Sequence, residues 1–135
     1  MTKDNFSIVI VLFPSYWNDN IPEAGIYLDG NLLSLEKLTV NQEIVKLEFP
    51  VELDYGEHEI AVKYENKNQS DIFWHEGKRL RENFIKIEKV YIDFSDLGNM
   101  VKQENKTVTL FNRNEYKIKF HSPIYYWMLN NIDKI

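Results

Sequence analysis

Alternating hydrophobic and polar residues predict a strand over residues 58–65. Ile60, Val62 and Tyr64 fall on one face of this stretch and polar residues fall mostly on the other, which is the period of a half-buried strand. A long polar segment, residues 66–81, separates it from a second strand pattern over residues 84–92. Two well-patterned strands joined by a wide loop favour a binding scaffold over a catalytic one.

The second strand pattern contains a break in parity. Ile85 and Ile87 share one parity, whereas Val90 and Ile92 share the other. One buried face can continue along the whole strand only if an extra residue is inserted near positions 88 and 89. The sequence therefore predicts a β-bulge there.

The remaining patterns predict short strands separated by turns. Residues 6–13 are almost entirely apolar and end at Pro14, and Asp29-Gly30 is a strong hairpin signal between residues 25–28 and 31–33. Residues 43–49 also alternate, and Pro50 either ends this strand or marks it as an edge strand. Residues 107–111 and 115–120 form a predicted hairpin through residues 112–114.

The C-terminal residues change to a helical period. Ser122-Pro123 could begin an amphipathic helix over residues 124–135, and a single helical turn is predicted within residues 94–100. Seven or more short strands with one terminal helix predict an all-β fold, a jelly-roll type β-sandwich of antiparallel strands with a short C-terminal helix.

Composition narrows the function classes. The chain has 135 residues, which predicts one domain, and it contains no cysteine, so neither a disulfide nor a cysteine-bound zinc is expected. Its net charge of −5 argues against nucleic acid as a partner. No segment approaches the length of a membrane span, and the first apolar run lacks the features of a signal peptide.

Trp74 and His75 are the first candidate ligand-binding residues, because they lie in the polar loop among Gln69, Asp71 and Glu76. Sugar-binding proteins use flat aromatic rings against the apolar face of a pyranose, with polar groups reading its hydroxyls. The alternative is that Trp74 folds back over the end of the sandwich and is buried. Both interpretations remain open from the sequence.

Tyr16 and Trp17 form a second candidate. They lie on a loop with Asn18, Asp19 and Asn20, so they could form another aromatic binding surface or pack against the hydrophobic edge of the sheets.

Metal and catalytic signals are weaker. Asp71 and Glu82 are candidate calcium ligands, but no fixed calcium-loop spacing is present, and solvated surface acids are the alternative. The three histidines are far apart, and the chain has no nucleophile elbow and no glycine-rich phosphate loop. The sequence therefore predicts no enzymatic activity.

Two segments resemble a known family. The stretch Gly56-Glu57-His58-Glu59-Ile60-Ala61-Val62, followed by Asn66-Lys67, and the stretch Ile87-Glu88-Lys89-Val90-Tyr91-Ile92-Asp93 resemble the calcium-dependent xylan-binding modules and the carbohydrate-binding-module-like proteins of tailed bacteriophages. The Tyr16-Trp17 loop, the hairpin at residues 26–30 and the segment 122–127 are similar to the short phage proteins. Where the family has Asp-Arg-Asn-Leu-Tyr, this chain reads Glu82-Asn83-Phe84-Ile85-Lys86.

The resemblance implies a jelly-roll β-sandwich without enzymatic activity that binds glycan or has a structural place on a virion. We therefore predict an adhesive or structural component of a phage particle, made in the host cytoplasm, with other virion proteins and host-surface glycan as partners and calcium as a candidate cofactor. Uncapped sheet edges would also allow a homo-oligomer. The alternative is an intracellular protein-interaction module that does not bind sugar.

Overall fold

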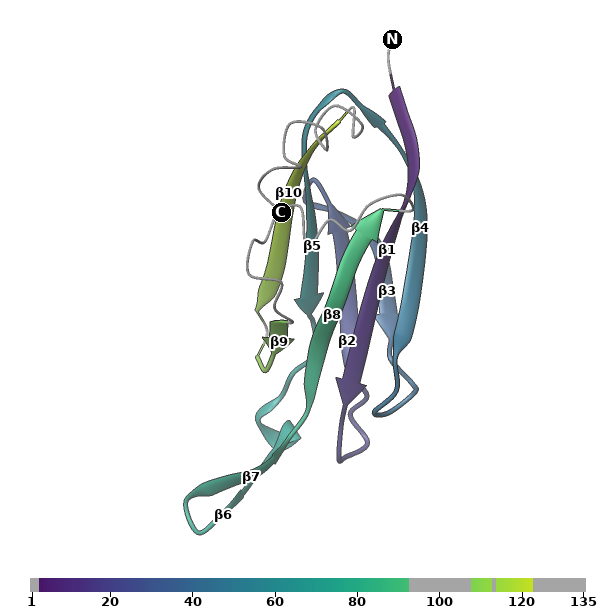
Figure 1. Cartoon of the computed structure of the whole chain (residues 1–135). Coiled ribbons are helices and arrows are strands. Elements are labelled where there is room, and N and C mark those ends of the chain that lie inside the picture. Colours follow the sequence, from purple (N-terminus) through teal and green to yellow (C-terminus); the bar gives the residue numbers. More distant parts are fainter. Residues whose placement is uncertain (1–2, 93–107, 113, 123–135) are drawn as a thin grey trace, which may run out of the picture.

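The computed structural model describes residues 3–92, 108–112 and 114–122, and they form a sandwich of two four-stranded antiparallel sheets (Figure 1). The strands of the first sheet, in spatial order, are β4 (Val45–Asp54), β1 (Lys3–Ser15), β8 (Phe84–Ile92) and β9 (Val108–Leu110). The strands of the second sheet are β10 (Glu115–Ser122), β5 (Gly56–Tyr64), β2 (Glu23–Leu28) and β3 (Asn31–Lys37). Because the chain crosses repeatedly between the layers, the predicted jelly-roll type β-sandwich is confirmed.

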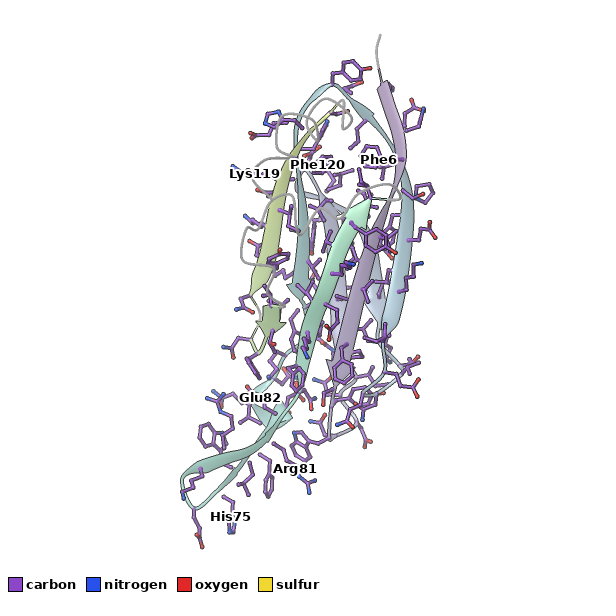
Figure 2. All side chains as sticks on the ribbon, viewed as in Figure 1. Phe6, His75, Arg81, Glu82, Lys119 and Phe120 are labelled. Carbon is purple, nitrogen blue, oxygen red and sulfur yellow. The ribbon has the colours of Figure 1, made fainter. Side chains whose placement is uncertain are left out.

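The core lies between the two sheets and is built from one face of each strand. The T-shaped contact between Phe6 of β1 and Phe120 of β10, with ring centroids 6.0 Å apart, joins the layers (Figure 2). The other large side chains that are almost fully buried are Tyr64, Ile8, Ile10, Leu12, Ile26, Leu38, Ile60, Ile85, Ile92 and Leu110. Burial of these apolar surfaces is the main stabilising term of the fold.

The predicted β-bulge lies in β8. Val11 of β1 pairs with Lys89, but the next residue, Leu12, pairs with Ile87, so Glu88 is the extra residue. The insertion keeps Ile85, Ile87, Val90 and Ile92 buried despite their change of parity. The prediction is confirmed in position and in cause.

Prolines occur inside two strands of the first sheet. The prediction that Pro14 ends the first strand is wrong, because β1 continues to Ser15 and Pro14 pairs with Ile85 of β8. The pairing of β1 with β4 stops at Leu12, and the Pro14 carbonyl instead accepts a hydrogen bond from the Gln42 amide, so the missing N–H of the proline breaks no ladder bond. The sequence allows Pro50 either to end a strand or to lie in an edge strand. The second role is confirmed, because Pro50 lies within β4, which is an edge strand.

The predicted hairpin at Asp29-Gly30 joins β2 to β3. Both turn residues have positive φ, 53° and 81°, the conformation of a type I′ turn. β3 is the edge of the second sheet and contains an extra residue, Leu33, opposite the step from Ile26 to Tyr27. Glu36 pairs with the buried Ala24 and so lies on the core side of this edge strand, where it accepts a hydrogen bond from the Ser34 hydroxyl.

The polar segment between β5 and β8 is not only a loop. It contains a short 3-10 turn (Gln69–Asp71) and a hairpin of β6 (Ile72–His75) and β7 (Lys78–Glu82) that projects from one end of the sandwich (Figure 1). Glu76 and Gly77 form its turn with φ of 52° and 74°. Both strands are largely exposed, so the hydrophobic alternation that marks the other strands is missing.

The predicted C-terminal hairpin is wrong in its pairing. β9 and β10 are both strands, but β9 pairs with β8 in the first sheet and β10 pairs with β5 in the second. The two strands therefore lie in different layers and do not form a hairpin within one sheet. The predicted helical turn within residues 94–100 and the predicted helix over residues 124–135 lie outside the described residues.

Candidate functional site

A polar network holds together the loops at the hairpin end of the sandwich. Asn83, which precedes β8 and is fully buried, accepts a hydrogen bond at Oδ1 from the Trp17 amide at 3.0 Å and donates from Nδ2 to Asn18 Oδ1 at 2.7 Å. Asn66 fixes the start of β2 in the same way, because its Oδ1 accepts from the Glu23 amide at 2.8 Å. Buried polar groups satisfied in this way hold a loop in one conformation.

Asp71 lies at the centre of this network and is fully buried. Its Oδ1 accepts from Asn18 Nδ2 at 2.8 Å, and its Oδ2 accepts from Asn20 Nδ2 at 2.7 Å and from the Asn68 amide at 2.8 Å. Three donors from two loops therefore converge on one carboxylate. Asp71 joins the β1–β2 loop to the segment before the projecting hairpin.

Glu82, at the end of β7, is held by two cations. Its Oε2 lies 3.0 Å from Lys67 Nζ and its Oε1 lies 2.7 Å from an Arg79 guanidinium nitrogen. Lys67 is itself buried and also donates to the carbonyls of Asn83 and Phe111. The Glu82 carboxylate is therefore already neutralised within the fold.

These contacts do not support the predicted calcium site. Calcium requires six to eight oxygen ligands, whereas the oxygens of Asp71 face N–H donors and those of Glu82 face cations. Across the described ranges, no three acidic, histidine or cysteine side chains are grouped so that they could hold a metal ion. The residues present thus fit a structural network better than a calcium site.

Trp17 is fixed on three sides. Its amide is bound by Asn83, its indole Nε1–H donates to the Asp71 carbonyl at 2.8 Å, and its ring makes a T-shaped contact with Phe73 of β6 at 5.6 Å between centroids. The side chain is nevertheless 38% exposed. Tyr16 is held by its hydroxyl, which donates to the Thr39 carbonyl at 2.9 Å.

An open groove of about 430 Å³ lies between this loop and the base of the hairpin. Figure 2 labels Arg81 and Glu82 at this base, with His75 at the far tip. The groove is lined by Ser15, Tyr16, Trp17, Gln42, Leu80, Arg81, Glu82 and Phe84. Three aromatic residues, four hydrogen-bonding or charged side chains and one aliphatic side chain, from distant segments of the chain, thus share one surface.

Trp74 and His75 lie on the projecting hairpin and do not line this groove. The interpretation of Trp74 as a buried residue over the end of the sandwich is wrong, because the side chain is 54% exposed. One face of its ring is covered by the Arg79 guanidinium, 5.5 Å from the centroid. His75 is exposed at the tip beside Glu76, with Nε2 and Oε1 3.7 Å apart.

Part of the groove is predictable from the sequence. Tyr16, Trp17 and Glu82 are predicted site residues, although the sequence favours a metal-binding role for Glu82 and indicates no role for Gln42, Arg81 or Phe84. Arg81 reaches the groove because the Asn83 and Asp71 network joins the β1–β2 loop to the segments that flank the hairpin. Gln42 reaches it through its own hydrogen bonds to Pro14 and Ser15, and no local pattern reveals such contacts. The available signal was the density of Asn and Asp in residues 18–20 and 66–71, since these side chains often bind backbone groups in loops.

No family model and no curated protein sequence matches the chain. Among solved structures, the chain is similar to the carbohydrate-binding module vCBM60 in complex with galactobiose, with 11% sequence identity and a TM-score of 0.45. The similarity covers 85% of this chain and 97% of that chain.

Proposed function

We propose that this chain is a non-enzymatic carbohydrate-binding protein and that its binding site is the groove between the β1–β2 loop and the projecting hairpin. The observation that carries the proposal is that Tyr16, Trp17 and Phe84 share this groove with Gln42 and Arg81. Aromatic rings suit the apolar face of a sugar, and the amide and guanidinium groups suit its polar edge.

The groove residues are held in place without a ligand. Trp17 is fixed by its two hydrogen bonds and by Phe73, and Tyr16 by Thr39. A side chain that is already ordered loses little conformational entropy on binding. This pre-organisation favours recognition of a ligand at the groove over a role as mobile loop surface.

The test is binding to an array of glycans, followed by calorimetric titration of the sugars that bind. Trp17→Ala is expected to weaken binding at least tenfold, because aromatic stacking on one ring contributes about 1–3 kcal/mol in related aromatic recognition. Because Trp17→Ala also removes a hydrogen bond to Asp71, Gln42→Ala serves as a second groove variant at an exposed position. Circular dichroism and thermal unfolding report whether each variant is folded.

Trp74→Ala is the matched control, because it removes an exposed tryptophan that does not line the groove. Retained binding in Trp74→Ala with loss in both groove variants supports the proposal. Loss in Trp74→Ala alone moves the binding site to the hairpin with Trp74 and His75. An array on which the wild-type chain binds no glycan contradicts the proposed function.

We further propose that the protein acts as an adhesive component of a phage particle, which is supported by the sequence resemblance given above. Its docking surface on other virion proteins would be the exposed aliphatic side chains of β3 and the loop after it, namely Leu32, Leu33, Leu35, Val40 and Ile44. Purified particles should contain the chain, and Leu32→Ser with Leu35→Ser should remove it from particles while leaving glycan binding unchanged.

The same aliphatic surface also favours the second candidate function, an intracellular protein-interaction module. In that case the wild-type chain would be absent from purified particles, and it would bind no glycan. Fractionation of infected cells together with the glycan array separates the two functions.

A further inference from the structure

The charge at the groove differs from the charge of the whole chain. The protein has a net charge of −5, yet the acidic side chain that lines the groove, Glu82, is matched by both Lys67 and Arg79. These pairs leave Glu82 with little negative charge to offer a ligand. The groove wall is therefore less acidic than the chain as a whole.

Arg81 supplies an uncompensated positive charge on this wall. Its side chain is exposed, and no acidic group in the described part of the chain pairs with it. It contrasts with Arg79, two residues away on the same strand, which binds Glu82 and covers the Trp74 ring.

The strand register directs Arg81 toward the aromatic side of the groove. Arg81 pairs with Phe73, so the two side chains lie on one face of the hairpin, and the Phe73 ring contacts Trp17. On β7, Leu80 is an extra residue, so Trp74 pairs with Arg79. The contact between Trp74 and Arg79 is separate from the face that carries Phe73 and Arg81. The hairpin thus has two pairs, each made of one aromatic residue and one arginine. In the pair near Trp17, which is Phe73 and Arg81, the guanidinium has no acidic partner among the described residues.

We infer that the groove selects carbohydrates that carry an anionic group, with the sugar ring against Trp17 and the anion bound by the Arg81 guanidinium. This inference rests on the proposed carbohydrate binding and specifies its ligand class. The planar guanidinium presents paired N–H donors that match a carboxylate, a sulfate or a phosphate. Because the net charge of the chain repels anions at long range, the selection must come from this local contact.

The experiment compares matched sugars that differ in one group. The array carries a neutral oligosaccharide, the same backbone with uronic acids in place of the neutral sugars, and a sugar-phosphate polymer. We expect the wild-type chain to bind at least one anionic form about tenfold more tightly than the neutral form, which is the size expected for a charge-assisted hydrogen-bonded pair. The uronate and phosphate arms show which source of the anion is preferred.

Arg81→Gln is expected to remove this preference, so that the variant binds the anionic and the neutral sugar with similar affinity. Arg81→Lys should restore the charge but only part of the affinity, since lysine lacks the paired donor geometry. The control is Lys119→Gln, which removes the same charge from an exposed position on β10, far from the hairpin in Figure 2. It should behave as the wild-type chain does.

The outcomes separate this inference from the proposed function. Equal binding of neutral and anionic sugars, or an anionic preference that survives Arg81→Gln, overturns the inference and leaves carbohydrate binding standing. Absence of binding to every sugar overturns both. An equal loss of anion binding in Lys119→Gln and Arg81→Gln would show a general charge effect and would also overturn the inference.

Discussion

Tyr64 carries a polar group in the core without a hydrogen-bond partner. The residue is fully buried, and its hydroxyl has no partner in the part of the chain that the structure describes. Burial, with a further contribution from the negative charges of Asp71 and Glu82, raises the pKa of Tyr64 well above its ordinary value. The hydroxyl is therefore neutral at any physiological pH and contributes a desolvation cost.

Tyr64→Phe is expected to stabilise the protein by about 1 kcal/mol, because it removes an unsatisfied buried hydroxyl and keeps the ring. Urea unfolding at neutral pH measures the change. Tyr16→Phe is the control, since its hydroxyl donates to the Thr39 carbonyl and its loss should be neutral or destabilising. A loss of stability in Tyr64→Phe would show that the hydroxyl has a favourable partner.

His58 links two turns at the end of the sandwich away from the hairpin. Its Nδ1 lies 2.6 Å from the Asp29 carboxylate and its Nε2 lies 2.7 Å from the Asp54 carbonyl. Both partners are acceptors, so both ring nitrogens donate, which requires the charged imidazolium. Burial lowers the pKa of His58, but the hydrogen bond to Asp54 and the bond and charge of Asp29 outweigh it, and the net pKa is raised.

The contribution of His58 to stability should therefore depend on pH. A raised pKa in the folded state means that the stabilisation is fully present below about pH 6.5, the ordinary histidine value, and is lost as the pH rises through the folded pKa. The difference in free energy of unfolding between wild type and His58→Gln should be larger near pH 6 than near pH 8. A pH-independent difference for His58→Gln would rule out the imidazolium link.

At the scale of elements, the contacts of Asp71 determine how the loops meet. Asp71→Asn replaces one acceptor oxygen by an NH₂ group that would face the amide donors of Asn18 or of Asn20 and Asn68. We expect a loss of about 1.5–3 kcal/mol in the free energy of unfolding, the range for hydrogen bonds to a charged group. Asp19→Asn, an exposed neighbour in the same loop, should change stability by less than about 0.5 kcal/mol. Similar stabilities for the two variants would contradict the central role of Asp71.

The elements also show which features the sequence could predict. The bulge in β8 was predictable because four isoleucine and valine side chains must share one buried face, and only an inserted residue reconciles their spacing. The β6–β7 hairpin was missed because its strands are exposed, so burial imposes no alternation on them. Only the Glu76-Gly77 turn gave a local signal.

Pairing between distant strands was harder to predict. The short connection between β9 and β10 has the length of a hairpin loop, yet each strand completes a different sheet. The alternation within a strand predicts which of its side chains face the core. It does not predict the strand that it pairs with, because pairing depends on which sheet edge lies nearby. The same limit applies to the groove, where the buried side chain of Asn83, two residues after Arg81, binds the Trp17 amide and so brings the two segments together.

At the scale of the whole molecule, stability depends on the two sheets remaining packed together. Phe120 is fully buried and contacts Phe6 across the layers. Phe120→Ala is expected to lower the free energy of unfolding by about 3–5 kcal/mol, because it removes apolar contacts and leaves a cavity. Ile44→Ala, at a side chain that is 58% exposed, is the control and should change it little. Comparable losses in both variants would show that the intersheet core is not the main source of stability.

Two of the edge strands, β3 and β4, affect how copies of the molecule behave when they are crowded together. An extra residue at Leu33 and the core-side Glu36 distort one edge, and Pro50 removes an N–H group from the other. A neighbouring chain therefore meets an irregular row of donors and acceptors on which fibrils cannot easily be templated. Many copies could be displayed at high local density without growing into amyloid from these two edges.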